Sequence, residues 1–128
     1  MKSSSAINSY AKINFESEVL GASPHRLISI LFEGALRDIN SAKVAIQNRQ
    51  TAAKGVAIGR AISIIGDGLN GSLNMEAGGE LAQNLHRLYD YMGLRLVEAN
   101  LKNDIGILDE VTSLLNEVKE GWDGIRPK

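Results

Sequence analysis

Apolar residues recur at helical spacing in four long segments of this chain, and no segment alternates polar and apolar residues as a strand would. The spacing i, i+3, i+4, i+7 puts side chains on one face of an α-helix, and that face must then be buried against a neighbour. The segments cover about residues 24–48, 51–74, 80–102 and 105–122. Because only short breaks separate them, the chain is predicted to be all-α and to form an antiparallel four-helix bundle.

Capping residues mark where these helices begin and end. Ser23 precedes Pro24, and a serine hydroxyl can accept a hydrogen bond from an orphan amide while proline fits the first helical position. Gly78 and Gly79 suit a left-handed helix end and a reversal of the chain. Asp104 is a suitable N-cap for the last helix. We therefore expect the third helix to start just after the two glycines.

Composition limits the domain organisation and the partners. Residues 1–22 begin with a serine-rich run, so they are predicted to be a flexible segment, and residues 23–125 the bundle domain. A net charge of -1 with scattered signs gives no basic stripe for nucleic acid or an anionic membrane. The chain has no cysteine and no apolar run of spanning length, so we expect a cytoplasmic protein without membrane insertion.

Candidate catalytic and metal-ligating residues are sparse. A di-iron bundle needs Glu-x-x-His pairs, but His25 and His86 are the only histidines and neither has a companion at metal-ligand spacing. No serine stands in a nucleophile-elbow context. Gly78 and Gly79 lack the preceding strand and the lysine that a phosphate-binding turn requires. We expect no enzymatic activity, no metal and no cofactor.

Two of the predicted helices carry more apolar side chains than one buried face requires. The core stripe of helix 80–102 is predicted to contain Leu81, Leu85, Leu88, Met92, Leu96 and Ala99. A second stripe on the same helix lies roughly opposite and contains Leu94, Val97 and Leu101. In helix 51–74 the apolar arc extends past the core line as a shallow trough of mostly small residues, namely Ala57, Ala61, Ile64 and Gly68.

The additional stripes have two interpretations. Both could pack inside the bundle, since bundles have wide interfaces. Alternatively, they form an exposed groove that binds a partner helix. Burying three aliphatic side chains contributes roughly 5 kcal/mol, whereas ordering a disordered partner costs about 2 to 5 kcal/mol. A groove made of Leu94, Val97 and Leu101 alone would barely suffice, so the partner is expected to cover the trough as well.

Several short features occur in a fixed order across almost the entire chain. They are Tyr10, ASPHRL (22–27), LFEGA (31–35), GGELAQNL (78–85), LYDYM (88–92), LVEAN (96–100) and Trp122. In these features the chain resembles the flagellar secretion chaperones, which bind flagellin before export. The resemblance implies an antiparallel bundle that holds the disordered C-terminal segment of flagellin, prevents its premature polymerisation in the cytosol and helps deliver it to the export gate. It implies neither catalysis nor use of ATP.

The resemblance also implies roles for individual residues. Ile7 and Tyr10 match an N-terminal segment that covers the client surface when no client is bound. They are predicted to be cap or partner-binding residues, with direct contact between Tyr10 and the client as the alternative. Phe32 stands where the family commonly has Tyr, and Asn74 where Asp is common.

The expected state without client is a monomer or a weak dimer. The rival hypothesis is a self-assembling structural or adaptor protein, in which the same apolar stripes join copies of the chain.

Overall fold

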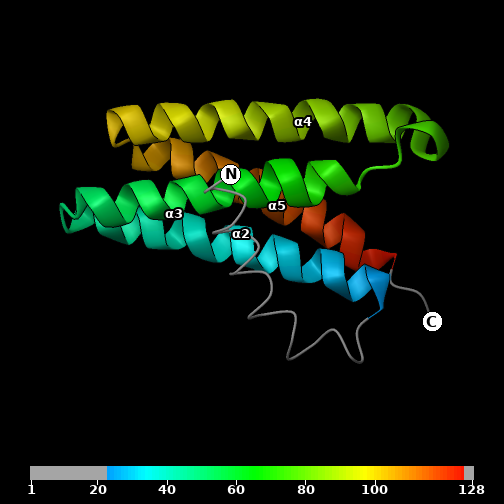
Figure 1. Ribbon diagram of the computed structural model, residues 1–128, viewed down its shortest axis with the longest axis horizontal. Coiled ribbons are helices and arrows are strands. Elements are labelled where there is room, and N and C mark those ends of the chain that lie inside the picture. The colour runs from blue at the N-terminus through cyan, green and yellow to red at the C-terminus, as the bar shows by residue number, and fades with distance from the viewer. Residues whose placement is uncertain (1–22, 126–128) are drawn as a thin grey trace.

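The computed structural model describes residues 23–125, which form four long helices arranged as an antiparallel bundle (Figure 1). The elements are α2 (Pro24–Gln47), α3 (Thr51–Ser63), a π-helical turn η1 (Ile64–Leu69), a 3₁₀ turn η2 (Asn70–Ser72), α4 (Met75–Lys102) and α5 (Ile105–Gly124). Each long helix runs opposite to the one before it, and α2 and α4 each pack against α3 and α5. The predicted all-α bundle is confirmed. Ile7 and Tyr10 lie outside the described residues.

The helix starts follow from their capping residues. The Ser23 hydroxyl accepts a hydrogen bond from the Arg26 amide at 3.1 Å, and Pro24 opens α2 as predicted. The Asp104 carboxylate accepts one from the Ile107 amide at 3.2 Å at the start of α5. Such caps satisfy amides that have no partner inside the helix.

The third helix starts earlier than predicted, although its long straight part does begin after the two glycines. α4 begins at Met75 because the Asn74 side chain accepts a hydrogen bond from the Ala77 amide at 2.9 Å, which caps the helix before the two glycines are reached. Gly79 then joins two helical stretches of α4 with a non-helical φ of 53°, so a kink lies at the predicted glycine break. The chain reverses at Leu73 and Asn74, which are extended.

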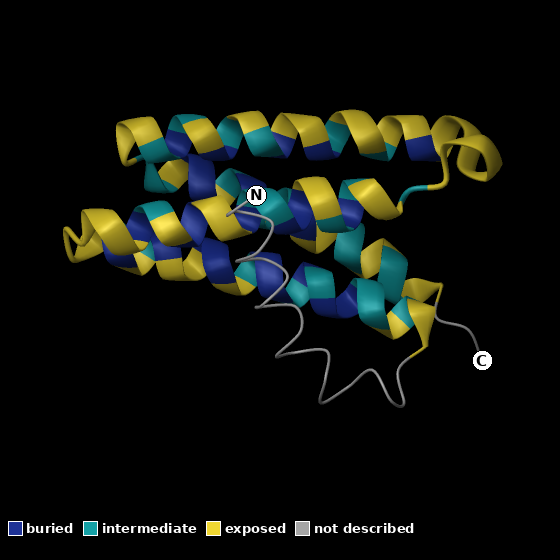
Figure 2. Ribbon diagram, viewed as in Figure 1, coloured by how far each residue is buried: buried dark blue, intermediate teal, exposed yellow. Residues whose placement is uncertain are grey.

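One apolar core runs along the inside of the bundle (Figure 2). The largest fully buried side chains are Phe32, Ile39, Ile58, Ile64, Ile65, Met92, Leu96, Leu108, Val111 and Leu115. Trp122 packs against the edge of this core. Within residues 23–125, no helix has both the length and the apolarity that crossing a membrane requires.

The prediction of an exposed trough on the second helix is wrong. Ala57, Ala61 and Ile64 are 6%, 0% and 1% exposed and belong to the core. This side of α3 and η1 packs against α2, and a Cβ added to Gly68 would come within 3.2 Å of the Leu31 methyl carbons. Small side chains let the two helices approach closely, so α2 itself covers the surface that the sequence left open.

Candidate functional site

The second stripe of α4 lies on the surface. Leu94, Val97 and Leu101 are 71%, 46% and 79% exposed, whereas Met92 and Leu96 on the opposite side are fully buried. Figure 2 shows the outer side of α4 exposed along most of its length. The spacing i, i+3, i+7 aligns the three side chains over two turns. They form an uncovered apolar surface, which we call the α4 ridge.

Polar side chains that pair with one another border the ridge on the α5 side. Arg95 donates to Glu110 at 2.8 Å and to Glu98 at 2.7 Å, and Lys102 donates to Glu98 at 2.8 Å. The Tyr91 hydroxyl donates to Glu110 at 2.5 Å. Hydrogen bonds from Tyr91 and Arg95 lower the pKa of Glu110, and the bond from Lys102 lowers that of Glu98. Both carboxylates therefore stay ionised and are already satisfied within the chain.

The α3 side of the ridge is lined by glycine. Gly93 precedes Val97 by one turn on α4, and Gly55 and Gly59 are one turn apart on α3. Both α3 glycines lie on the side of α3 away from Ala57, and Gly59 is exposed. A Cβ added at any of the three would meet no atom within 4 Å. We call the strip made of Gly55, Gly59, Gly93 and Val97 the α3–α4 seam, and none of these four residues carries a charge.

A second apolar concavity lies at the end of the bundle where α2 begins and α5 ends. It encloses about 380 Å³ between side chains of α2, η1, α4 and α5. Apolar residues dominate its lining, which includes Ile28, Phe32, Leu69, Leu73, Leu81, Leu85, Tyr89, Val118 and Trp122. Burial raises the pKa of Tyr89 to about 12, so its hydroxyl stays neutral. We call this concavity the end cavity.

One residue of the end cavity, Leu81, differs from what the sequence indicated. Leu81, predicted to be core, is 67% exposed at the rim, because it follows the Gly79 kink at the start of α4. Phe32 is buried, as its place in the helical spacing of the first helix predicts. The periodicity of helix 80–102 could not reveal the cavity, because its other walls come from distant parts of the sequence.

A reciprocal pair of hydrogen bonds fastens the helix ends beside the end cavity. The His25 ring nitrogen Nε2 donates to the Trp122 carbonyl at 2.7 Å, and Trp122 Nε1 donates to the His25 carbonyl at 3.1 Å. Their rings stack with centroids 4.6 Å apart. His86 lies on the surface of α4 beside Asn70 and Asp90. No group of three or more His, Asp or Glu residues in the described part of the chain could hold a metal ion.

Comparisons with known proteins agree in the family that they indicate. A family model described as flagellar protein FliS matches residues 6–128. The chain is 52% identical over 120 residues to the flagellar secretion chaperone FliSB of Pseudomonas aeruginosa, covering 94% of each chain. It is 45% identical over 128 residues to the flagellar secretion chaperone FliS of Salmonella typhimurium, covering 100% of this chain and 95% of that one. The Escherichia coli FliS is 39% identical over 122 residues, covering 95% and 90%.

Proposed function

Because this chain belongs to the FliS family of flagellar secretion chaperones, we propose that its client is the disordered C-terminal segment of flagellin. Binding would keep flagellin from polymerising in the cytoplasm and deliver it to the export gate. The observation that carries the proposal is the α4 ridge, an apolar surface that nothing in residues 23–125 covers. A chaperone of this family has a protein client, and an amphipathic client helix fits a surface with apolar anchors at helical spacing.

We propose that the client helix lies on the α3 side of the ridge. The α5 side is occupied by Arg95, Glu98 and Glu110, whose charges are paired with one another. Displacing them would break charge-assisted hydrogen bonds. On the α3 side, Gly59 and Gly93 leave room for a helix to approach the backbone closely. The seam therefore replaces the buried trough as the second half of the site.

The free-energy balance also requires a second contact. The ridge alone supplies roughly 5 kcal/mol, about the cost of ordering a disordered segment. Leu81 at the end cavity precedes Leu94 by thirteen residues, which is about 20 Å along α4 at a rise of 1.5 Å per residue. A client segment that contacts both surfaces would bury enough apolar area for stable binding. We propose the end cavity as this second anchor.

Titration calorimetry with the isolated C-terminal segment of the cognate flagellin tests the ridge. Leu94→Asp and Leu101→Asp should each weaken binding at least tenfold, or about 1.4 kcal/mol, while thermal unfolding stays nearly unchanged. Val56→Asp is the matched control, because Val56 is an exposed aliphatic residue on the α2 side of α3. Unfolding of the Leu94 and Leu101 variants, or equal weakening by Val56→Asp, would remove the ridge from the site.

Ile64→Asp is not a client-binding variant, although the sequence placed Ile64 in the groove. This side chain is buried, so the change would put a charge in the core and unfold the protein.

Light scattering of the wild-type protein, with and without the flagellin segment, decides between the chaperone and the self-assembling alternative. A chaperone should be a monomer or weak dimer that forms a one-to-one complex with the client. A self-assembling protein should be a stable oligomer whose mass does not change when the client is added.

A further inference from the structure

Asp38 is a buried carboxyl group at the contact between α2 and α3. It lines an outer groove formed by these two helices, together with Val44 and Val56. The residue is 5% exposed, and its Oδ2 atom has no hydrogen-bond partner among the described residues. An ionised carboxylate that is buried and incompletely hydrogen-bonded weakens the contact that buries it. The protonated group costs less to bury.

α3 is the helix least able to hold itself in place. Its N-cap residue, Gln50, makes no side-chain capping bond, and Gly55 and Gly59 each cost about 1 kcal/mol in a helix interior. After only 13 residues the α-helix changes into the π-helical turn η1. A helix with these features depends on its tertiary contacts, and the contact with α2 contains Asp38.

We propose that Asp38 makes the attachment of α3 to α2 sensitive to proton concentration, so that α3 detaches more readily when this carboxyl group is ionised. Local opening of a single helix is a common motion of folded proteins. Here the opening helix would carry Gly55 and Gly59, which form one side of the α3–α4 seam. The inference concerns the free protein and does not depend on the identity of the client.

The charges around Asp38 support the proposed role of this carboxyl group. Burial raises the pKa of Asp38 to about 6, although Arg60 on α3 and Arg37 on α2 oppose the shift. On the other elements that pack against α2, Asp67 of η1 is exposed, and Asp109 of α5 is bound by Lys43 at 3.0 Å. The two arginines therefore compensate the buried charge only in part.

The sign of the effect follows from the two protonation states. Attached α3 holds the Asp38 proton with a pKa of about 6, whereas a detached helix exposes a carboxyl group with the ordinary value of 3.8. The attachment is therefore strongest below the ordinary pKa, weakens as pH rises between the two values, and changes little above the higher one. Between about pH 5 and about pH 7 the opening constant should rise about tenfold.

Native-state hydrogen exchange of the full chain at these two pH values tests the proposal. In the wild type, the α3 amides should lose about tenfold in protection factor relative to the α5 amides as pH rises. Asp38→Asn should abolish this difference. Asp38→Ala should abolish the difference too. This second variant keeps the test valid if the asparagine side chain disturbs the packing at this position. Gly59→Ala is the matched control, because it should raise α3 protection at both pH values and leave their ratio unchanged.

Two outcomes would overturn the proposal. In the first, both Asp38 variants keep the pH dependence of the wild type, which would assign it to another group. In the second, α3 and α5 amides exchange together with one pH dependence, which would mean that Asp38 titrates only in global unfolding.

Discussion

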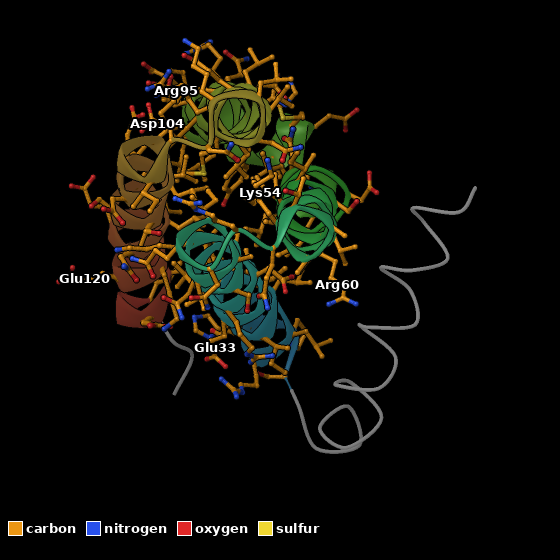
Figure 3. The ribbon with its side chains drawn as sticks, turned by 90° about the vertical axis from the view of Figure 1, so that its left-hand side faces the viewer. Glu33, Lys54, Arg60, Arg95, Asp104 and Glu120 are labelled. Carbon is orange, nitrogen blue, oxygen red and sulfur yellow. The ribbon has the colours of Figure 1, made fainter. Side chains whose placement is uncertain are left out.

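At the scale of single residues, Lys54 departs most from what its type suggests. A lysine is normally solvated, but this one is buried and its ammonium group donates to the Asn100 carbonyl at 2.9 Å and to Asn103 Oδ1 at 2.6 Å. Figure 3 shows Lys54 between α3 and α4, whereas Arg60 points out of the bundle. Asn103 ends α4 with a left-handed φ of 51°. Lys54 thus ties the start of α3 to the turn between α4 and α5.

Replacing Lys54 should lower the free energy of unfolding more than replacing an exposed lysine does. Lys54→Ala leaves the Asn100 carbonyl and the Asn103 amide without their donor, and an unsatisfied buried group costs about 1 to 3 kcal/mol. The free energy of unfolding, measured by urea denaturation, should fall by that amount. Lys43→Ala is the control, since the exposed pair with Asp109 is worth about 0 to 1 kcal/mol. Equal losses in both variants would show that Lys54 has no special structural role.

At the scale of elements, the second helix differs most from its prediction. The sequence pattern indicated one helix over residues 51–74, but the α-helix ends at Ser63 and continues as η1 and η2 to Ser72. The wider π turn contains Gly66 and Gly68, and the Ser72 hydroxyl donates to the Gly68 carbonyl at 2.5 Å. Glycine-rich sequence weakens the α-helical preference, so tertiary packing selects the local geometry.

Two glycine substitutions should therefore have opposite effects on stability. Gly59→Ala should raise the free energy of unfolding by about 1 kcal/mol, because alanine is the better helix former and its Cβ meets nothing within 4 Å. Gly79→Ala should lower it by about 1 kcal/mol, because Gly79 adopts a positive φ that a side chain disfavours. Thermal unfolding of the two variants measures both signs. A stabilising Gly79→Ala would mean that the kink is not required.

At the scale of the whole molecule, two apolar surfaces are left at opposite ends of α4. The ridge lies near the end that meets α5, and the end cavity lies near the start of α2 (Figure 1). An uncovered apolar surface favours aggregation. Ile7 and Tyr10 lie outside the described residues, and we propose that their segment covers part of this surface until the client displaces it. A tethered cover acts at high effective concentration without binding tightly.

Deleting residues 1–12 should therefore raise client affinity or association rate. The covered molecules cannot bind, so their fraction reduces the apparent affinity of the intact chain. Calorimetry with the flagellin segment measures the affinity, and light scattering should detect more self-association of the shortened chain. Tyr10→Ala distinguishes the alternative. If it weakens binding while the fold stays intact, Tyr10 contacts the client and the cover hypothesis fails.

The sequence by itself determined the secondary structure class and the helix starts at Ser23 and Asp104. These features depend on interactions within a few residues of the chain. The sequence also showed that Leu94, Val97 and Leu101 lie on the side of their helix opposite Met92 and Leu96. Local periodicity carries that angular information.

Only the tertiary structure decided which wide apolar arc was buried. Ala57 and Leu94 both lay outside a core line, yet α2 packs on the first and nothing described covers the second. The same holds for Leu81, Lys54 and Asp38, whose surroundings come from helices distant in sequence. A helical pattern fixes the angle at which a side chain leaves its helix, whereas burial depends on which neighbour approaches at that angle and how closely.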